Sequence, residues 1–483
     1  MGQEITHRHF KQKDFEHYRL QMEAEMRLLR QWFRQTEPHV ESPLKVGFEM
    51  ELCLVDQQGL PAGINQEFID TLQDSHVTPE LAKFNIELNS EVYPLNGSFL
   101  QGLHQELKQF WETSQRTAKQ LEHHILMTGI LPSLRKEHLD LSNMSNMTRY
   151  HVLNEQVLRS RKGRAIELDI LGRESLKTMH QDVMLESAAT SFQLHLQIPF
   201  YRAVRYYNAA QILSAPLVAI AANSPYLFGK DLWCETRIPV FEQAVSAGGY
   251  DGAAFGPIKR VSFGSGYVKE SLLECFEENI EHYPVLLPEV FDRPADELAH
   301  LSLHNGTVWR WNRPLIDKNL GDEETRERFH LRLEHRVLPA GPTVVDCIAN
   351  AALFYGAVTA LANQYEIPEQ HLPFVQAKDN FYLAARQGLN ARLNWLHGQS
   401  MSLAVLLREH IIPMAKEGLS QIGVTHRDID LYLGIIEARL QNQQTGSMWQ
   451  RAYVEKHGND MQKLTLDYIE HQRSGQPVHL WEI

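Results

Sequence analysis

Alternation with a period of two dominates residues 44–52, where Leu, Val, Phe and Met at even positions separate Gly47, Glu49 and Glu51. Successive side chains of a β-strand point to opposite faces, so this pattern predicts a strand with one apolar and one acidic face. A single strand cannot bury an apolar face by itself. The chain must therefore fold around a sheet whose second face holds carboxylates side by side.

Three further segments, at residues 84–92, 190–198 and 331–338, repeat this arrangement. An antiparallel sheet with one solvated face would alternate in the same way, but we would expect Lys, Thr, Ser and Gln on its wet face. These segments instead carry mainly groups that bind ions. Their polar positions are Asn85, Glu87, Asn89, Gln193, His195, Gln197, Arg332, Glu334 and Arg336.

Carboxylates from several neighbouring strands need compensating positive charge. Two unit charges about 5 Å apart repel by roughly 3 kcal/mol at an effective dielectric near 20. Divalent cations with oxygen and imidazole ligands supply that charge, and Mg²⁺ also holds nucleotide phosphates. Arg332 and Arg336 flank Glu334, and their planar forks suit phosphate oxygens. The pattern favours a face that binds metal and phosphate.

The remaining patterns place these strands in an α+β chain. We expect an N-terminal helical segment (1–40) that ends near Glu37-Pro38, a catalytic domain (41–365) and a helical C-terminal part (366–483) that completes the site. Within the catalytic domain the patterns predict helices at 98–124, 202–222 and 344–364, and further strands at 166–171 and 302–311.

Composition narrows the class of protein. The net charge is −13 and no long basic stripe is present, which argues against nucleic acid as a partner. The four cysteines are far apart, which favours reduced thiols over disulfides or a zinc ribbon. The N-terminus lacks the apolar core of a signal peptide, and the longest apolar stretch, 212–222, is about half a membrane span. We expect a cytoplasmic protein without a membrane partner.

The ordered set of motifs resembles the glutamate–cysteine ligase and carboxylate–amine ligase families. Gly47-Phe48-Glu49-Met50-Glu51-Leu52 is similar to their opening Gly-x-Glu-x-Glu strand, and the Glu80 to Asn89 stretch to their second acidic strand. Gln193-Leu194-His195 resembles the family histidine strand, and the 332–336 stretch resembles the late Glu-x-Arg strand. Weaker similarities are Asn223-Ser224-Pro225-Tyr226 with Arg237, and Thr445-Gly446-Ser447 with Gln450-Arg451.

The resemblance implies a glutamine-synthetase-like fold: a mostly antiparallel curved sheet with a metal-lined concave face and helices on its other face. It implies an ATP-dependent ligase that forms an amide, of γ-glutamyl type, through an acyl phosphate. Arg336 and Glu334 would act in catalysis, Arg332 and Asn89 would help to bind ATP, and Arg237 would clamp a substrate carboxylate. Two or three Mg²⁺ ions would be held by Glu49, Glu51, Glu87, His195 and Glu334, with Glu80 left open.

The stretch from His304 to Arg313 is rich in aromatic and basic residues. Arg310 or Arg313 can bind a substrate carboxylate, with Trp309 or Trp311 packed beside it. A strand with a packed tryptophan and a surface arginine fits the stretch equally well. The sequence therefore leaves the acid and amine substrates open, and it leaves the oligomeric state open too.

Two other functions stay open at this point. One is an ATP:guanidino phosphotransferase, because a site of this kind can also pass phosphate to nitrogen. The other is a relative that binds nucleotide without catalysis, although intact metal and phosphate positions argue against it. The sequence contains no Gly-x-x-x-x-Gly-Lys-Ser/Thr motif, which argues against a P-loop enzyme.

Overall fold

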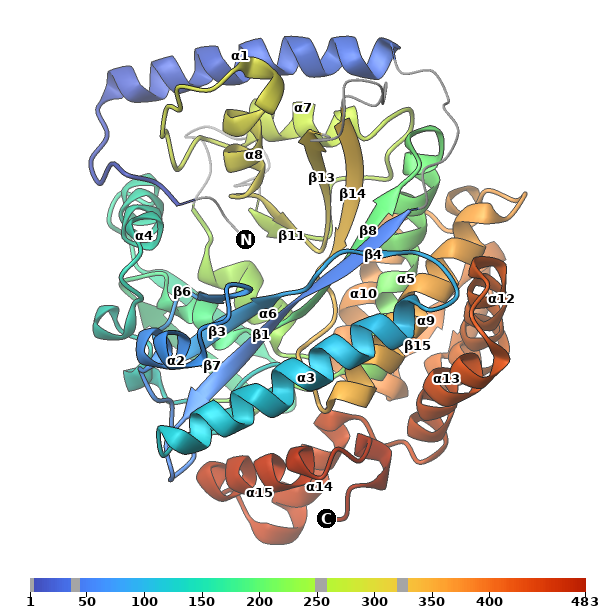
Figure 1. The fold of residues 1–483 in the computed structure, drawn as a ribbon. Coiled ribbons are helices and arrows are strands. Elements are labelled where there is room, and N and C mark those ends of the chain that lie inside the picture. The colour runs from blue at the N-terminus through green and yellow to red at the C-terminus, as the bar shows by residue number, and fades with distance from the viewer. Residues whose placement is uncertain (1–3, 36–43, 248–258, 319–328) are drawn as a thin grey trace.

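One twisted sheet forms the centre of the computed structural model, which describes residues 4–35, 44–247, 259–318 and 329–483. Its strand order is β13-β14-β8-β1-β3-β2, all neighbours are antiparallel, and β4 and β5 also pair with β1. The strand direction turns markedly between β1 and the β13–β14 pair (Figure 1). The strands are β1 (Lys45–Val55), β2 (Val77–Pro79), β3 (Asn85–Asn89), β4 (Tyr93–Pro94), β5 (His124–Leu126), β8 (Phe192–Ile198), β13 (Asn312–Lys318) and β14 (Phe329–His335).

The register of the sheet aligns the polar positions in rows that cross the strands. The predicted strands at 44–55, 84–92, 190–198 and 331–338 correspond to β1, β3, β8 and β14, although β14 ends one residue before Arg336. The mixed helix and antiparallel-sheet architecture is thereby confirmed. The rows are Arg313–Glu334–His195–Gly47, Gln193–Glu49–Asn89 and Glu51–Glu87.

The apolar face of the sheet packs on the helices α3 (Phe99–Gln120), α5 (Ala203–Ala221) and α9 (Val344–Asn363). Helix α9 is long and apolar enough to cross a membrane, but 94% of its most apolar window is buried inside the protein. The hydroxyl of Tyr355 on α9 lies 3.0 Å from the carbonyl oxygens of both Gly47 and His195. Helix α9 therefore supports β1 and β8 directly beneath the polar rows.

A helical layer follows in residues 366–483, interrupted by the hairpin of β15 (Arg392–Asn394) and β16 (Ser400–Ser402). Helix α12 packs against α9 so closely that a Cβ added at Gly418 would lie 1.9 Å from the carbonyl oxygen of Gly356. The helices are α10 (Phe374–Gln387), α11 (Leu403–Leu406), α12 (Ile412–Ile422), α13 (His426–Gln441), α14 (Gly446–His457) and α15 (Met461–Arg473).

On the polar side of the sheet, α1 (Gln12–Gln35) lies across α7 (Leu273–His282) and α8 (Ala299–Asn305), as Figure 1 shows. Glu25 of α1 is buried, and its carboxylate accepts hydrogen bonds from the backbone N–H groups of His300 and Leu301. These are among the first N–H groups of α8, which have no partner inside their own helix. A side chain from α1 thus caps α8.

Smaller elements complete the chain around the sheet. The strand predicted at 166–171 is confirmed as β6, which forms a hairpin with β7, and β11 pairs with β12 in parallel. The remaining elements are α2 (Asn65–Leu72), α4 (Thr148–Ser160), α6 (Arg237–Ala244), β6 (Ile166–Leu171), β7 (Ser175–His180), β9 (Tyr226–Leu227), β10 (Lys230–Asp231), β11 (Val261–Ser262) and β12 (Trp309–Arg310).

The prediction of a single strand at 302–311 is wrong. Residues up to Asn305 belong to α8, and a strand begins only at Trp309. The apolar positions in this stretch belong to the buried face of a short helix. That helix is capped by Glu25, which lies far away in the sequence, so local patterns cannot reveal the cap. The break expected at Glu37-Pro38, and the domain boundary at residues 40–41, lie outside the described residues.

We predict that Gly418→Ala destabilises the protein by about 1–3 kcal/mol, because a methyl group at the α9–α12 contact forces two backbones apart. Gly434→Ala in α13 is the matched control, because no atom lies within 4 Å of its added Cβ. Alanine is favoured over glycine inside helices, so the control should gain up to about 1 kcal/mol. Denaturant unfolding measures both changes, and equal effects would contradict the close contact.

Candidate active site

A cavity of about 340 Å³ opens between the polar face of the sheet and the segments that surround α8. The sheet contributes most of its charged lining, and apolar side chains such as Leu287, Leu303 and Ile316 form another part of the wall. The charged and polar lining from the confirmed strands consists of Glu49, Glu51, Glu87, Gln193, Arg332, Glu334 and Arg336, and β13 adds Arg313.

Three of the predicted metal ligands meet at the edge of this cavity. Ligand atoms of Glu49, His195 and Glu334 all lie within 4.8 Å of one another, and Nε2 of His195 is 3.2 Å from Oε1 of Glu49. Two carboxylates and an imidazole are donors that suit a divalent cation. Arg332 contacts the other imidazole nitrogen, with its Nη1 at 3.1 Å from Nδ1.

Glu334 is held by two arginines. Arg313 grips both carboxylate oxygens through its guanidinium fork, and Nη1 of Arg336 donates to Oε1 at 2.8 Å. Burial works to raise the pKa of Glu334, but the charges of Arg313 and Arg336 outweigh it and lower the pKa to about 2. The carboxylate is therefore ionised at neutral pH and already carries counterions.

The carboxylates at the other end of the polar face are poorly compensated. Burial, followed by the charge of Glu80, raises the pKa of Glu51 to about 7. Burial, with Glu80 and Glu51, raises the pKa of Glu186 to about 8, and burial together with Glu49 raises that of Glu87 well above its usual value. Arg336 works to lower the pKa of Glu51 and of Glu186, but it does not outweigh burial and the neighbouring carboxylates. A divalent cation would fit this donor set and would supply the missing positive charge.

Hydrogen bonds orient this acidic group on the sheet. Glu51 accepts from the backbone N–H of Ser191 at 2.7 Å and from Nε2 of Gln193 at 2.8 Å. The other end of the Gln193 amide accepts a hydrogen bond from Nη1 of Arg336. Gln193 therefore joins the acidic end of the site to its basic end.

Arg336 is the cation best placed to meet an anion in the cavity. It follows β14, its side chain is buried, and it lines the cavity. Its Nε atom is buried and finds no hydrogen-bond partner among the residues that the structure describes. A buried guanidinium with unused donor capacity suits the binding of phosphate oxygens.

The structure does not bring every predicted site residue into the cavity. Arg237 is buried against Glu235 at 3.1 Å, and it donates to the carbonyl oxygens of Arg336 and Val337. Arg310 is also buried, and it is paired with Glu278 at 3.0 Å. Neither arginine lines the cavity. The N–H donors of both are directed at other protein groups. Both arginines therefore belong to the framework around the site.

The other predicted positions lie in or beside the cavity. Trp309 and Arg313 line it, as does Glu80, whose role the sequence leaves open. Asn89 lies behind the lining residues and donates to Oε1 of Glu87 at 3.0 Å. His195 likewise reaches the site through its contacts with Glu49 and Arg332.

Sequence reasoning missed several residues of the cavity wall. Arg149, Tyr150, Glu186 and Asp317 all line it, and none belongs to an alternating polar row that was used to find the site. Arg149 lies in the first turn of α4, and Glu186 lies in a short 3₁₀ helix before β8. No spacing rule links such positions to a strand face. Asp317 lies on the same face of β13 as Arg313, but Leu315 between them breaks the alternation that would have pointed to it.

The two weaker similarities meet each other outside the cavity. Nε2 of Gln450 lies 3.2 Å from Oδ1 of Asn223, and a Cβ added at Gly446 would lie 2.0 Å from that same oxygen. This contact fastens α14 to the end of α5. These stretches therefore join the C-terminal helices to the catalytic sheet.

We predict that Arg237→Gln destabilises the protein by about 3–5 kcal/mol, because it leaves Glu235 buried without its cation. Arg30→Gln is the control. Its pair with Glu277 has a similar 2.8 Å distance but is partly exposed, so its loss should change stability by about 0–1 kcal/mol. A substrate-binding role for Arg237 would instead predict normal unfolding with weakened substrate affinity.

Comparison with solved structures finds a chain whose fold is similar to that of this protein. A glutamate–cysteine ligase from Francisella tularensis, solved in complex with AMP, is 12% identical with a TM-score of 0.52, covering 92% of this chain and 91% of that one. A bifunctional glutathione synthetase from Pasteurella multocida is 13% identical with a TM-score of 0.49, covering 94% of this chain and 55% of that one. No curated protein matches the sequence.

The family described as glutamate-cysteine ligase family 2 (GCS2) matches residues 45–463. This match extends from β1 through α14 into α15, and so includes every strand of the central sheet. The chain therefore belongs to glutamate-cysteine ligase family 2, and with it to the ATP-dependent ligases that form carbon–nitrogen bonds.

Proposed function

We propose that the protein joins a small carboxylate, of the amino-acid class, to an amine in a reaction driven by ATP and Mg²⁺. The observation that carries this proposal is the cavity in which poorly compensated carboxylates face buried arginines. Negative groups of this kind attract divalent cations, and guanidinium groups attract phosphate. A site with both kinds of group suits a magnesium-bound triphosphate.

Mg²⁺ would be held by Glu49, Glu51, Glu87, His195 and Glu334, with two or three ions sharing these donors. Glu80 is a further candidate because it faces the same cavity and raises the pKa of Glu51. When bound, the ions would neutralise phosphate charge. Glu334 has two oxygens with several lone pairs, so it can contact a cation while it keeps an arginine.

His195 contacts Arg332 through Nδ1, and its Nε2 lies 3.2 Å from Glu49. A bound cation would take the lone pair of Nε2, and Arg332 would then lose its contact with Nδ1. Asp317 would still accept a hydrogen bond from Nε of Arg332, at 2.8 Å.

In the proposed reaction, an oxygen of the substrate carboxylate attacks the γ-phosphorus of ATP, and ADP leaves. The product of this step is an acyl phosphate. The amine then attacks the acyl carbon, and phosphate leaves as the amide forms. Arg336 would hold the transferred phosphoryl group, and Glu334 would keep that guanidinium oriented. This chemistry depends on positioning and charge neutralisation, which the arginines and carboxylates provide.

Substrate recognition is assigned to the part of the cavity near Trp309 and Arg313. Arg313 is the candidate to bind a substrate carboxylate, since it lines the cavity and Arg237 and Arg310 do not. Its Nε and Nη2 are bonded to Glu334, so Nη1 would be the donor that meets the substrate. Trp309, with Leu287 and Leu303, offers an apolar surface in the same cavity. We infer a substrate that has both a carboxylate and an apolar portion.

A screen of amino-acid pairs for Mg²⁺-dependent phosphate release tests the proposed reaction. The expected result is ADP, free phosphate and a product whose mass equals the two substrates joined with loss of water. A stable phosphoguanidine would assign the protein to the guanidino phosphotransferases instead. ATP binding without any turnover on a broad panel would favour a non-catalytic relative.

We predict that Glu49→Gln and Glu334→Gln each lower Mg²⁺-dependent ATP turnover by at least about 100-fold, because each removes charge that stabilises the transition state. Glu437→Gln is the control, since this carboxylate lies on the surface and pairs with Lys416. Steady-state kinetics with each purified variant measure the effect. Turnover like that of the wild type in both site variants would remove these residues from the proposed mechanism.

We predict that Arg336→Lys lowers kcat by at least about tenfold although the charge is kept. A lysine ammonium is a point charge and cannot donate from a planar fork to Glu334, Gln193 and phosphate at once. Arg386→Lys on the exposed side of α10 is the matched control and should retain normal kinetics. Unchanged ATP kinetics in Arg336→Lys would contradict the phosphate role.

A further inference from the structure

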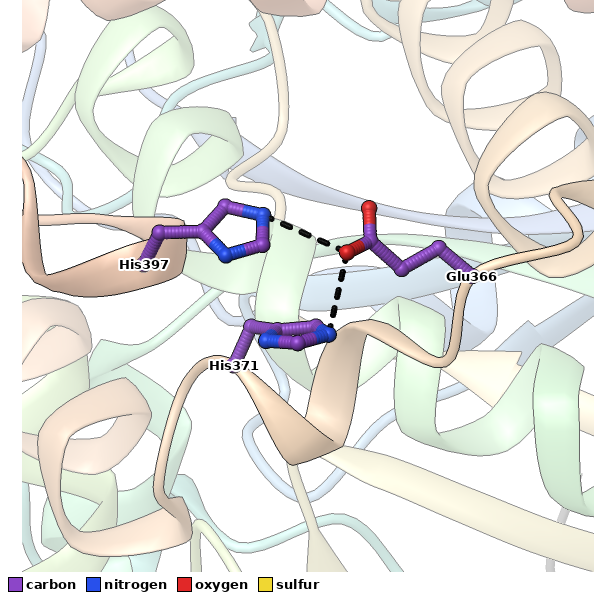
Figure 2. Close-up of side chains that lie close together, drawn as sticks. All are labelled: Glu366, His371 and His397. Carbon is purple, nitrogen blue, oxygen red and sulfur yellow. Dashed lines mark ion pairs between the residues drawn. The ribbon is translucent and has the colours of Figure 1, made fainter.

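A second cluster of metal-ligating side chains lies outside the cavity. Glu366, His371 and His397 come from two loops, and their side chains point toward one another in Figure 2. Nε2 of His371 lies 3.0 Å from Oε1 of Glu366, and Nε2 of His397 lies 3.4 Å from the same oxygen. None of the three residues lines the proposed active site.

The backbone holds the two imidazoles side by side. Glu366 and His371 flank the 3₁₀ helix Pro368–Gln370 between α9 and α10, whereas His397 lies in the turn between β15 and β16. The N–H of His397 donates to the carbonyl of His371 at 3.1 Å, and the ring centroids are 4.2 Å apart. The two loops therefore present both Nε2 atoms to one carboxylate.

His397 adopts a backbone conformation that favours glycine or asparagine. Its φ of 58° and ψ of 25° lie in the left-handed region, and Gly398 follows with a φ of 71°. A histidine in this conformation is strained by roughly 1–3 kcal/mol. Its imidazole is thereby directed at Glu366 and His371, and that placement calls for a compensating interaction.

The spacing of the three donors matches a metal site. Zinc bonds of about 2.0–2.1 Å place neighbouring ligand atoms of a tetrahedron roughly 3.3 Å apart. Two separations in this cluster are 3.0 and 3.4 Å, and all three donors lie within 4.8 Å of one another. Only a small adjustment is needed for the three atoms to surround one ion.

The surrounding charges leave the Glu366 carboxylate facing the histidines. Nη2 of Arg205 donates to the backbone carbonyl of Glu366 at 2.8 Å, and its ion pair is with Glu369 at 3.9 Å. The guanidinium of Arg205 therefore binds the backbone of this loop. The side chains of the cluster are partly exposed, so an ion from solvent can reach them.

We propose that Glu366, His371 and His397 bind a divalent transition-metal ion of the zinc class, with water in the remaining position. Two imidazole nitrogens and one carboxylate favour such ions over Mg²⁺, which prefers oxygen ligands. The ion joins the β15–β16 turn to the α9–α10 connection. This proposal is independent of the proposed ligase reaction.

Zinc titration of the full chain in excess Mg²⁺ tests this site, and the loss of one Zn²⁺ in variants of Glu366, His371 or His397 assigns that ion to it. The wild type should bind one Zn²⁺, and Co²⁺ in its place should give the visible absorption of a four-coordinate site. His371→Gln, His397→Asn and Glu366→Gln should each weaken Zn²⁺ binding by at least about tenfold. Asparagine tolerates the left-handed conformation, so His397→Asn removes the imidazole without adding backbone strain.

His282→Ala is the matched control, because this half-exposed histidine also pairs with a glutamate but belongs to no group of three metal-ligating side chains among the described residues. It should bind Zn²⁺ as the wild type does. Thermal unfolding gives a second readout: Zn²⁺ should raise the Tm of the wild type and of the control, but not that of the double variant His371→Gln/His397→Asn. Absence of Zn²⁺ binding in the wild type, or equal binding in the double variant, would overturn the proposal.

Discussion

The need to neutralise buried carboxylates governs this structure. The polar face of the sheet gathers more acidic groups than its arginines can compensate, and the two ends of the face meet that constraint differently. At one end Arg313 and Arg336 hold Glu334 ionised, with a pKa of about 2. At the other end Glu51 and Glu186 have pKa values raised to about 7 and 8. Charge is thus balanced by arginines on one side of the site and remains poorly balanced on the other.

The sheet produces this polarity through its register. Pairing of β13, β14, β8, β1 and β3 makes neighbours of polar positions that are far apart in the sequence, such as Glu49 with Gln193 and His195 with Glu334. The apolar sides of the same strands rest on α3, α5 and α9. A shift of the strand register by one residue would therefore turn every polar side chain of the site into the core. Packing on one face therefore fixes the chemistry on the other. The C-terminal helices add rigidity through the backbone contact of Gly356 with Gly418.

The sequence predicts the strands that carry the site better than it predicts the neighbouring residues that decide the role of each side chain. Glu49, His195 and Glu334 could be identified because alternation places a side chain on a face without tertiary information. Arg237 and Arg310 have the right chemistry, but their buried partners Glu235 and Glu278 become visible only in the folded chain. Glu186 belongs to a short 3₁₀ helix, where no period exists to point to it. The helix at 299–305 was hidden because its cap comes from α1.

That cap has a consequence for the order of assembly. Glu25 reaches the N–H groups of His300 and Leu301 across 275 and 276 positions of the chain, whereas Glu51 meets Glu87 across a much shorter loop. Contacts between distant segments form more slowly than contacts between near ones, because a longer loop must be closed first. The pairing of the acidic strands β1 and β3 can thus form before α1 and α8 cover the cavity. Ions would then have access to the carboxylates of these strands before the folding protein has enclosed them.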